Sequence, residues 1–230
     1  MKKVLGSLIM IIFVSSCNQQ INKPKSSLNM EKTYLALGDS YTIGESVSQD
    51  QSFPFQLSAR LKLNGVQTAS PEIIATTGWT TDELIKAISE KNLKKKYDLV
   101  TLLIGVNNQY RGYSQENYRL EFKELLKTAL LYADNQKERV IVISIPDWGV
   151  TPFAKKSGKD LEKISKQIDA FNAINKEEAV KLGVKYLNIT KSSRNALTES
   201  TLIAEDGLHP SGKMYGEWAA GLVPLVLQKH

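Results

Sequence analysis

Few residues of this chain could perform chemistry that requires an imidazole or a thiol. The 230 residues include two histidines, His209 and His230, and one cysteine, Cys17. A single cysteine allows no disulfide within the chain, and these three residues are too few for a zinc site built from cysteine and histidine. We therefore expect no metal and no other cofactor. Any step that needs an imidazole depends on His209, or else on the residue at the chain terminus.

Four short segments carry the remaining candidates. Segments 38–41 (GDSY), 76–79 (TTGW) and 105–108 (GVNN) each follow a predicted strand, and segment 206–210 (DGLHP) precedes the last predicted helix. Taken alone, the first is more often a turn and helix cap than a nucleophile, and the others are typical of turns, caps and loop hydrogen bonds. Sites in open parallel sheets gather beyond the carboxyl ends of the strands. The four segments share one edge of the predicted sheet and follow one another in a fixed order. Together they therefore indicate a functional site more specifically than any one segment does.

Alternating strands and helices must position these segments. Short β-branched, apolar runs alternate with longer helical patterns, and Thr80 followed by Glu83 predicts a capping box at a helix start. The continuous apolar run 99–104 indicates a strand that is covered on both faces. The predicted strands are 34–37, 73–75, 99–104, 140–145 and 184–189, and the predicted helices are 53–63, 80–91, 114–133, 160–182 and 213–227, the last interrupted near Pro224.

Five strands separated by helices predict one parallel sheet in a three-layer α/β/α sandwich. The chain is 42% hydrophobic and 23% charged, which fits a globular domain and argues against a disordered or multi-span membrane protein. We expect a single domain over residues 31–230, without internal repeats.

The four segments resemble the sequence blocks of the SGNH subfamily of GDSL esterases and lipases. The serine, glycine, asparagine and histidine that name the subfamily fall on Ser40, Gly78, Asn107 and His209, and Asp206 matches the acid of its Asp-x-x-His motif. The resemblance extends from Thr33 to the final helix. It implies a flavodoxin-like fold and the hydrolysis of carboxylic esters.

The resemblance implies a nucleophile, a base and an acid. A serine hydroxyl such as that of Ser40 is a poor nucleophile until a base accepts its proton. His209 is the expected base, because His230 ends the chain. Asp206 can turn back to hold the imidazole by its Nδ1–H. Asp147 is a competing carboxylate, but Asp206 has the better spacing to His209.

The resemblance also implies an oxyanion hole. The backbone N–H groups of Ser40 and Gly78 and the side-chain amide of Asn107 would supply three donors. Gly78 has no Cβ, so its backbone can approach a substrate closely. The third block departs from the common Gly-x-Asn-Asp pattern, because Asn108 replaces the aspartate. That change affects the hydrogen bonding of the loop and removes no catalytic group.

Two other motif readings fail, and two other functions stay open. Segment 207–214 matches the phosphate-binding G-x-x-x-x-G-K pattern, but Met214 lacks the final hydroxyl and Pro210 removes a backbone donor. The Gly-x-Ser-x-Gly signature of α/β-hydrolases is absent, because Thr42 stands where the second glycine would be. The open alternatives are a non-catalytic, lipid-anchored ligand-binding protein on the same scaffold, and an acyltransferase.

The N-terminus is predicted to direct export. In residues 1–16, Lys2 and Lys3 precede an apolar run, 4–14, that is too short to span a bilayer. Segment 14–17 (VSSC) resembles a bacterial lipobox, and an ordinary secretory signal is the alternative. A lipidated Cys17 would anchor the protein to a membrane of the bacterial cell envelope, and we interpret residues 17–30 as that cysteine and a polar tether.

The expected partners are this membrane and a small-molecule ester, lipid or acetylated glycan as substrate. The formal net charge of +6 falls by two when the signal lysines are removed, and so mild an excess predicts no nucleic acid. Tyr41, Trp79, Tyr110 and Trp148 could line the site, although packing at the rim is as good an interpretation. Arg111 could meet a carboxylate or phosphate, but an exposed arginine without a role is the more common case.

Overall fold

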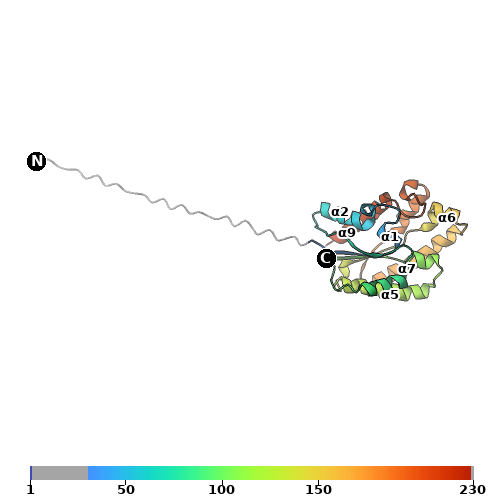
Figure 1. Cartoon of the computed structure of the whole chain (residues 1–230), viewed down its shortest axis with the longest axis horizontal. Helices are drawn as coiled ribbons and strands as arrows, with labels where there is room; N and C mark the ends of the chain where they lie inside the picture. The colour runs from blue at the N-terminus through green and yellow to red at the C-terminus, as the bar shows by residue number, and fades with distance from the viewer. Residues whose placement is uncertain (2–30, 229–230) are drawn as a thin grey trace.

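Five strands form one sheet at the centre of the computed structural model, which describes residue 1 and residues 31–228 (Figure 1). Of the predicted signal peptide, residues 1–16, only Met1 is described. Outside the described residues lie the predicted lipobox with Cys17, the predicted tether 17–30, and His230. The strands are β1 (Tyr34–Gly38), β2 (Glu72–Ala75), β3 (Leu99–Leu103), β4 (Val140–Ile143) and β5 (Lys185–Leu187). All neighbours pair in parallel, which confirms the predicted fold class.

The strand order creates a switch point beside the first strand. The order is β2-β1-β3-β4-β5, so the chain leaves β1 toward one edge, returns, and builds the rest of the sheet on the other side. Loops at the carboxyl ends of β1 and β3 then diverge and leave a crevice, which is where flavodoxin-like sheets bind ligands. Ser40 follows β1 and Asn107 follows β3, so both predicted residues lie at this crevice.

Helices cover both faces of the sheet. In Figure 1, α1 (Ser40–Ile43), α2 (Phe53–Leu63) and α9 (Gly212–Leu227) lie on one side, and α5 (Gln115–Tyr132) and α7 (Leu161–Leu182) lie on the other. Helix α3 (Thr81–Lys91) packs against α5. Shorter helical segments are α4 (Val106–Tyr110), α6 (Pro152–Lys156), α8 (Thr190–Ser193), η1 (Gln49–Gln51), η2 (Lys137–Arg139), η3 (Trp148–Val150), η4 (Arg194–Leu197) and η5 (Ser200–Leu202).

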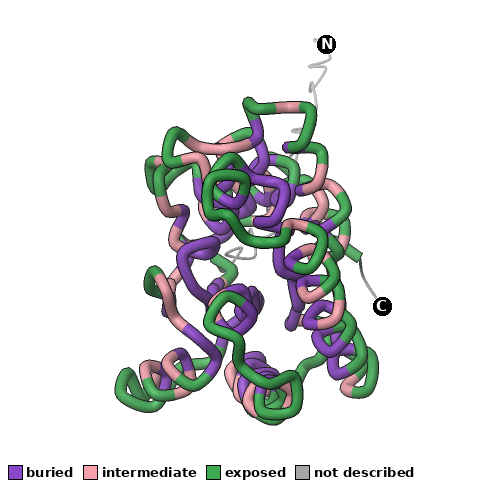
Figure 2. Tube along the Cα trace, turned by 90° about the vertical axis from the view of Figure 1, so that its right-hand side faces the viewer, coloured by how far each residue is buried: buried purple, intermediate pink, exposed green. Residues whose placement is uncertain are grey.

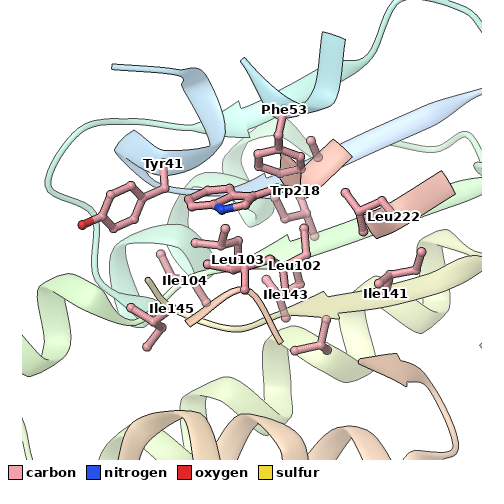
Figure 3. Packing of buried hydrophobic residues seen from close by; sticks show 14 of the residues in the cluster. Tyr41, Phe53, Leu102, Leu103, Ile104, Ile141, Ile143, Ile145, Trp218 and Leu222 are labelled. Atoms are coloured by element: carbon pink, nitrogen blue, oxygen red, sulfur yellow. The ribbon is translucent and has the colours of Figure 1, made fainter. Parts of the chain in front are cut away.

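The core lies between these layers. Every residue of β1, β3 and β4 is buried, as the apolar run 99–104 predicted, and Figure 2 shows buried segments inside a rim of exposed ones. Trp218 of α9 packs between Phe53 and Tyr41 above the strands (Figure 3), with ring centroids 6.3 and 6.4 Å away. Each large apolar side chain buried in this way contributes about 1.5–3 kcal/mol. This packing fixes α9 and α2 over the start of α1.

The predicted helices match the observed ones closely, with one correction. Helix α2 has the predicted bounds, and Glu83 caps α3 by accepting the Thr80 N–H at 2.8 Å. The predicted interruption near Pro224 is wrong, because α9 continues through it to Leu227. A proline this close to a helix end removes one hydrogen bond, and the bond from Gln228 N to the Pro224 carbonyl, 3.0 Å, closes the last turn.

Two short helices that carry site residues, α1 and α4, have no counterpart in the prediction. Each contains only four or five residues, which is too short to show a 3.6-residue period. Within residues 31–228, no helix combines the length and the apolar character that a membrane crossing requires.

Candidate active site

The Gly-Asp-Ser segment places Ser40 at the first position of α1. A Cβ on Gly38 would lie 2.1 Å from Thr42 Oγ1 and 2.3 Å from the Leu103 carbonyl, so only glycine lets the chain turn this tightly between β1 and β3. Asp39 caps the helix, with its Oδ1 accepting the Tyr41 N–H at 3.0 Å. Each residue of the segment therefore has a separate physical task, and together they hold the Ser40 hydroxyl at the sheet edge.

Asp39 is a buried carboxyl that is only partly satisfied. Its side chain is fully buried, and within the described residues its Oδ2 has no hydrogen-bond partner. Burial raises the pKa of Asp39 to about 7, although the Tyr41 N–H acts in the opposite direction. The protonated, neutral form of this side chain is thus the one that the fold favours.

The segment ahead of α9 forms a tight turn around the carboxylate of Asp206. Its Oδ1 accepts the N–H groups of Leu208 and His209 at 2.9 and 3.0 Å, and Gly207 between them has φ +73°. The left-handed glycine lets the chain reverse here. The turn brings the imidazole of His209 back over its own acid.

His209 joins the two ends of the domain. Its Nε2 lies 3.1 Å from Ser40 Oγ, and its Nδ1 lies 2.5 Å from Asp206 Oδ2. The residue is 9% exposed, and its ring packs edge-on against Tyr41 at 5.7 Å between centroids. An unbroken series of hydrogen bonds therefore runs from hydroxyl to imidazole to carboxylate, the arrangement that activates a serine.

Hydrogen bonds keep Asp206 ionised. Partial burial alone would raise its pKa, but the bonds from His209, from the Leu208 N–H and from Ser46 together hold the pKa of Asp206 well below its usual range. The carboxylate therefore stays negative at any pH at which the protein is expected to work, and it can stabilise an imidazolium.

A cavity of about 240 Å³ opens directly over these groups. Ser40, Gly78, Asn107 and His209 all contribute to its lining, so the four blocks that are far apart in the sequence converge on one space. The other lining residues are mainly apolar or aromatic: Tyr41, Thr77, Val106, Tyr110, Trp148, Phe153 and Leu208. The cavity therefore combines a few polar groups with apolar and aromatic side chains, as ligand sites commonly do.

The loop that carries Gly78 is held at successive residues. Thr77 Oγ1 donates to the Glu45 carboxylate, Arg111 donates to the Gly78 carbonyl at 2.6 Å, and the Asn107 amide donates to the Trp79 carbonyl at 2.9 Å. Gly78 itself has φ +86°. Within the described part of the chain, the N–H groups of Ser40 and Gly78 donate to no protein acceptor, which leaves both free for a substrate oxygen.

Asn108 accounts for the departure from the common third block. Its Oδ1 accepts the Thr81 N–H at 3.1 Å, and its amide donates to Thr81 Oγ1 at 2.6 Å. Thr81 Oγ1 in turn donates to the Glu121 carboxylate. An aspartate at position 108 would place a second carboxylate on the same hydroxyl, so the asparagine keeps the loop bonding intact beside Glu121.

Some of the other residues that the sequence analysis singled out line the cavity, and others do not. Tyr41, Tyr110 and Trp148 line the cavity, whereas Trp79 is half-buried against the core and is not among its lining residues. Asp147 is committed to Arg194, whose Nε donates to its Oδ2 at 2.8 Å.

The sequence analysis did not identify Thr77, Val106, Phe153 or Leu208 as lining residues. Thr77, Val106 and Leu208 lie within the segments 76–79, 105–108 and 206–210, so membership in those segments was an available signal for them. Phe153 starts from α6 and reaches the cavity only through tertiary packing. Within residues 31–228, no group of three or more metal-ligating side chains could hold a metal ion.

Comparison with known proteins gives one family and several similar folds. Residues 36–216 match the model of the GDSL-like lipase/acylhydrolase family. A lipase/acylhydrolase from Enterococcus faecalis has a TM-score of 0.63 at 20% identity, with 84% of this chain and 94% of that chain covered. The psychrotrophic esterase EstA from Pseudoalteromonas sp. has a TM-score of 0.64 at 14% identity, covering 85% and 97%.

The acetylxylan esterase Axe2 from Geobacillus stearothermophilus has a TM-score of 0.63 at 16% identity, covering 86% of this chain and 95% of that chain. At these identities the similarity concerns the fold. No curated protein sequence gives a significant match.

The raised pKa of Asp39 predicts a pH-dependent stability. Unfolded, this carboxyl loses its proton near pH 4, whereas in the folded protein it keeps the proton up to about pH 7. The folded state therefore binds the extra proton in this window, and stability must fall as the pH rises through it. We expect Asp39→Asn, which cannot ionise, to reduce the loss of unfolding free energy between pH 5 and pH 8 by roughly 2–3 kcal/mol.

Urea unfolding of wild type and variant at both pH values measures this difference. Other titrating groups, including Asp206, are shared by the two proteins and cancel in the comparison. Asp50→Asn, at an exposed carboxyl, is the matched control and should behave as wild type. An Asp39→Asn protein with the wild-type pH dependence would contradict the assignment of the buried proton.

Proposed function

Because the chain belongs to the GDSL-like lipase/acylhydrolase family, we propose that it is a serine esterase with Ser40 as nucleophile, His209 as base and Asp206 as acid. The observation that carries the proposal is the hydrogen-bond series from Ser40 Oγ through the imidazole to the Asp206 carboxylate, with distances of 3.1 and 2.5 Å. It faces a cavity that can hold an ester.

The proposed reaction has two halves. Ser40 Oγ attacks the ester carbonyl carbon while His209 Nε2 takes its proton, and the imidazolium then gives that proton to the departing alcohol oxygen. Water, deprotonated by the same imidazole, attacks the acyl-serine and releases the acid and the free serine. General acid–base catalysis of this kind contributes about 10²–10⁴-fold. Asp206 stabilises the imidazolium between the two transfers.

The oxyanion formed in each half needs donors at fixed positions. The free N–H groups of Ser40 and Gly78 and the second N–H of the Asn107 amide are suited to this task, because all three residues line the cavity. The first N–H of that amide is engaged by the Trp79 carbonyl, which fixes the plane of the group. Donors that are already oriented cost no reorganisation when the charge develops.

The size and lining of the cavity support short or medium acyl groups. A space of about 240 Å³ with Val106, Trp148 and Leu208 among its walls suits an acetyl group or a modest alkyl chain. We propose that the substrates are esters of short or medium acyl groups, and that the alcohol moieties to compare are the glycerophosphodiester of phospholipids and the sugar hydroxyls of glycans. Use of an alcohol in place of water would make the same machinery an acyltransferase.

The nucleophile is tested by Ser40→Ala. We expect the variant to lose at least a thousandfold in the hydrolysis of p-nitrophenyl esters and to lose labelling by a fluorophosphonate probe, because Ser40 Oγ is the one hydroxyl among residues 31–228 that bonds to the His209 ring. Rates with p-nitrophenyl acetate through palmitate, and mass spectrometry of the labelled protein, give both readouts.

The control for Ser40→Ala removes the hydroxyl of another serine near the site. Ser48→Ala is suitable because Ser48 is exposed, whereas Ser52 is buried and its substitution could disturb packing. The Ser48→Ala variant should retain full activity and labelling. Folded wild-type protein that neither turns over any ester nor reacts with the probe would refute the esterase and favour a ligand-binding protein on this scaffold.

The oxyanion hole is tested by Asn107→Ala. Losing one such donor costs roughly 3–4 kcal/mol of transition-state stabilisation, so turnover should fall at least a hundredfold while urea unfolding stays close to wild type. Asn117→Ala removes an exposed amide of α5 and is the control. A near-wild-type kcat in the Asn107 variant would exclude the amide from this role.

We also propose that the protein is exported and anchored in the cell envelope by a lipidated Cys17. Support comes from the lipobox-like segment 14–17 and from its coincidence with the single cysteine of the chain. Cells fed an alkyne fatty acid should label the wild-type protein but not Cys17→Ser, which should also leave the membrane fraction. Equal labelling of both proteins would contradict the anchor.

A further inference from the structure

The turn that follows the nucleophile helix contains an unusual backbone conformation at Ser46. Its φ is +65°, in the left-handed region that glycine, asparagine and aspartate occupy most easily. Among residues 31–228, Ser46 is the only residue other than these three types with a positive φ. Such a conformation is retained only where the surrounding structure stabilises it, and it is found most often at functional sites.

The side chain of Ser46 hydrogen-bonds to the carboxylate of Asp206. Its Oγ donates to Asp206 Oδ2 at 2.7 Å, the same oxygen that lies 2.5 Å from His209 Nδ1. The other carboxylate oxygen is occupied by the N–H groups of Leu208 and His209. The carboxylate thus has four donors, and Ser46 is the one that lies outside its own turn.

Donors within the turn and the donor outside it constrain the Asp206 carboxylate differently. The bonds from segment 206–209 orient the carboxylate within its own turn, but they cannot fix that turn relative to Ser40. Ser46 belongs to the nucleophile side, because the Ser40 carbonyl accepts the N–H groups of Gly44 and Glu45 at 3.2 and 3.1 Å. The Ser46–Asp206 bond therefore closes a ring that runs from Ser40 through the turn to the acid and back through His209.

We propose that Ser46 is a positioning residue of the esterase, whose hydroxyl sets the Asp206 carboxylate, and through it His209, relative to the nucleophile helix. The inference rests on the proposed function. About 31% of the Asp206 side chain is exposed, so without this donor the oxygen would be solvated by water that holds no fixed direction. Glu45, the neighbouring residue, accepts from Thr77 of the Gly78 loop, so the same turn also contacts the oxyanion side.

Two substitutions at position 46 separate the hydroxyl from the backbone. Ser46→Ala removes the hydroxyl and keeps the unfavourable φ, whereas Ser46→Gly removes the hydroxyl and relieves it. We expect both to lower kcat roughly fivefold to tenfold with KM changed less than twofold, the effect of one lost hydrogen bond to a charged group at a partly exposed site. Ser48→Ala, two residues away and also exposed, removes a hydroxyl that bonds to no described residue and should leave kcat unchanged.

A measurement that does not depend on turnover accompanies the kinetics. The proton between His209 Nδ1 and Asp206 should give a downfield NMR resonance, because the two atoms lie 2.5 Å apart. In both Ser46 variants it should shift or broaden, while in Ser48→Ala it should stay in place. Urea unfolding checks that all three variants are folded.

The outcomes distinguish this inference from the proposed function. Slower turnover and an altered resonance in both Ser46 variants support it. Variants that match Ser48→Ala in both readouts overturn it, and so does a defect in Ser46→Ala that is absent from Ser46→Gly, because that pattern would assign the effect to the backbone. Absence of wild-type esterase activity would refute the proposed function, whereas an active wild type with unaffected Ser46 variants would refute only the positioning role.

Discussion

The hydrogen bond between Ser40 Oγ and His209 Nε2 joins residues that are 169 positions apart, and the rest of the site depends on it. It can form only because β1 lies inside the sheet, beside its switch point, while α9 returns across the same face. Packing of α9 against α2 fixes the start of that helix, and the turn ahead of it presents the imidazole. The parallel topology thus brings together two side chains that are far apart in the sequence.

Aromatic packing couples this bond to the core. Trp218 of α9 contacts Tyr41, the neighbour of Ser40 (Figure 3). Tyr41 in turn packs edge-on against the His209 ring. Rings in such contacts resist reorientation because their shapes interlock at the density of a protein interior. The buried carboxyl of Asp39 caps α1, and its Oδ2 has no hydrogen-bond partner in the described structure. A poorly solvated carboxyl at the start of α1 costs folding free energy.

The loop that carries Gly78 is held by two segments. Glu45, which follows α1, accepts from Thr77, while Asn107 of α4 and Arg111, the C-cap of α4, donate to the Trp79 and Gly78 carbonyls. From the sequence, Arg111 is expected to be an exposed arginine without a role, or else to meet an anion. The side chain is exposed, but its guanidinium donates to the Gly78 carbonyl and pairs with Glu83. A loop with a left-handed glycine has many accessible conformations, so these contacts select the one that leaves its N–H free.

The amino-acid sequence by itself determined the fold class, the longer helices and strands, and the four segments at the sheet edge, because hydrophobic periodicity and glycine-rich turns are local properties. It also indicated Asp206 over Asp147, since spacing of three residues suits a turn. Only the tertiary structure decided that Phe153 reaches the cavity, that Arg111 and Asn108 hold neighbouring loops, and that Ser46 meets Asp206. Those contacts join residues from separate elements. The distances between such residues depend on how the elements pack, and a local sequence pattern does not predict that packing.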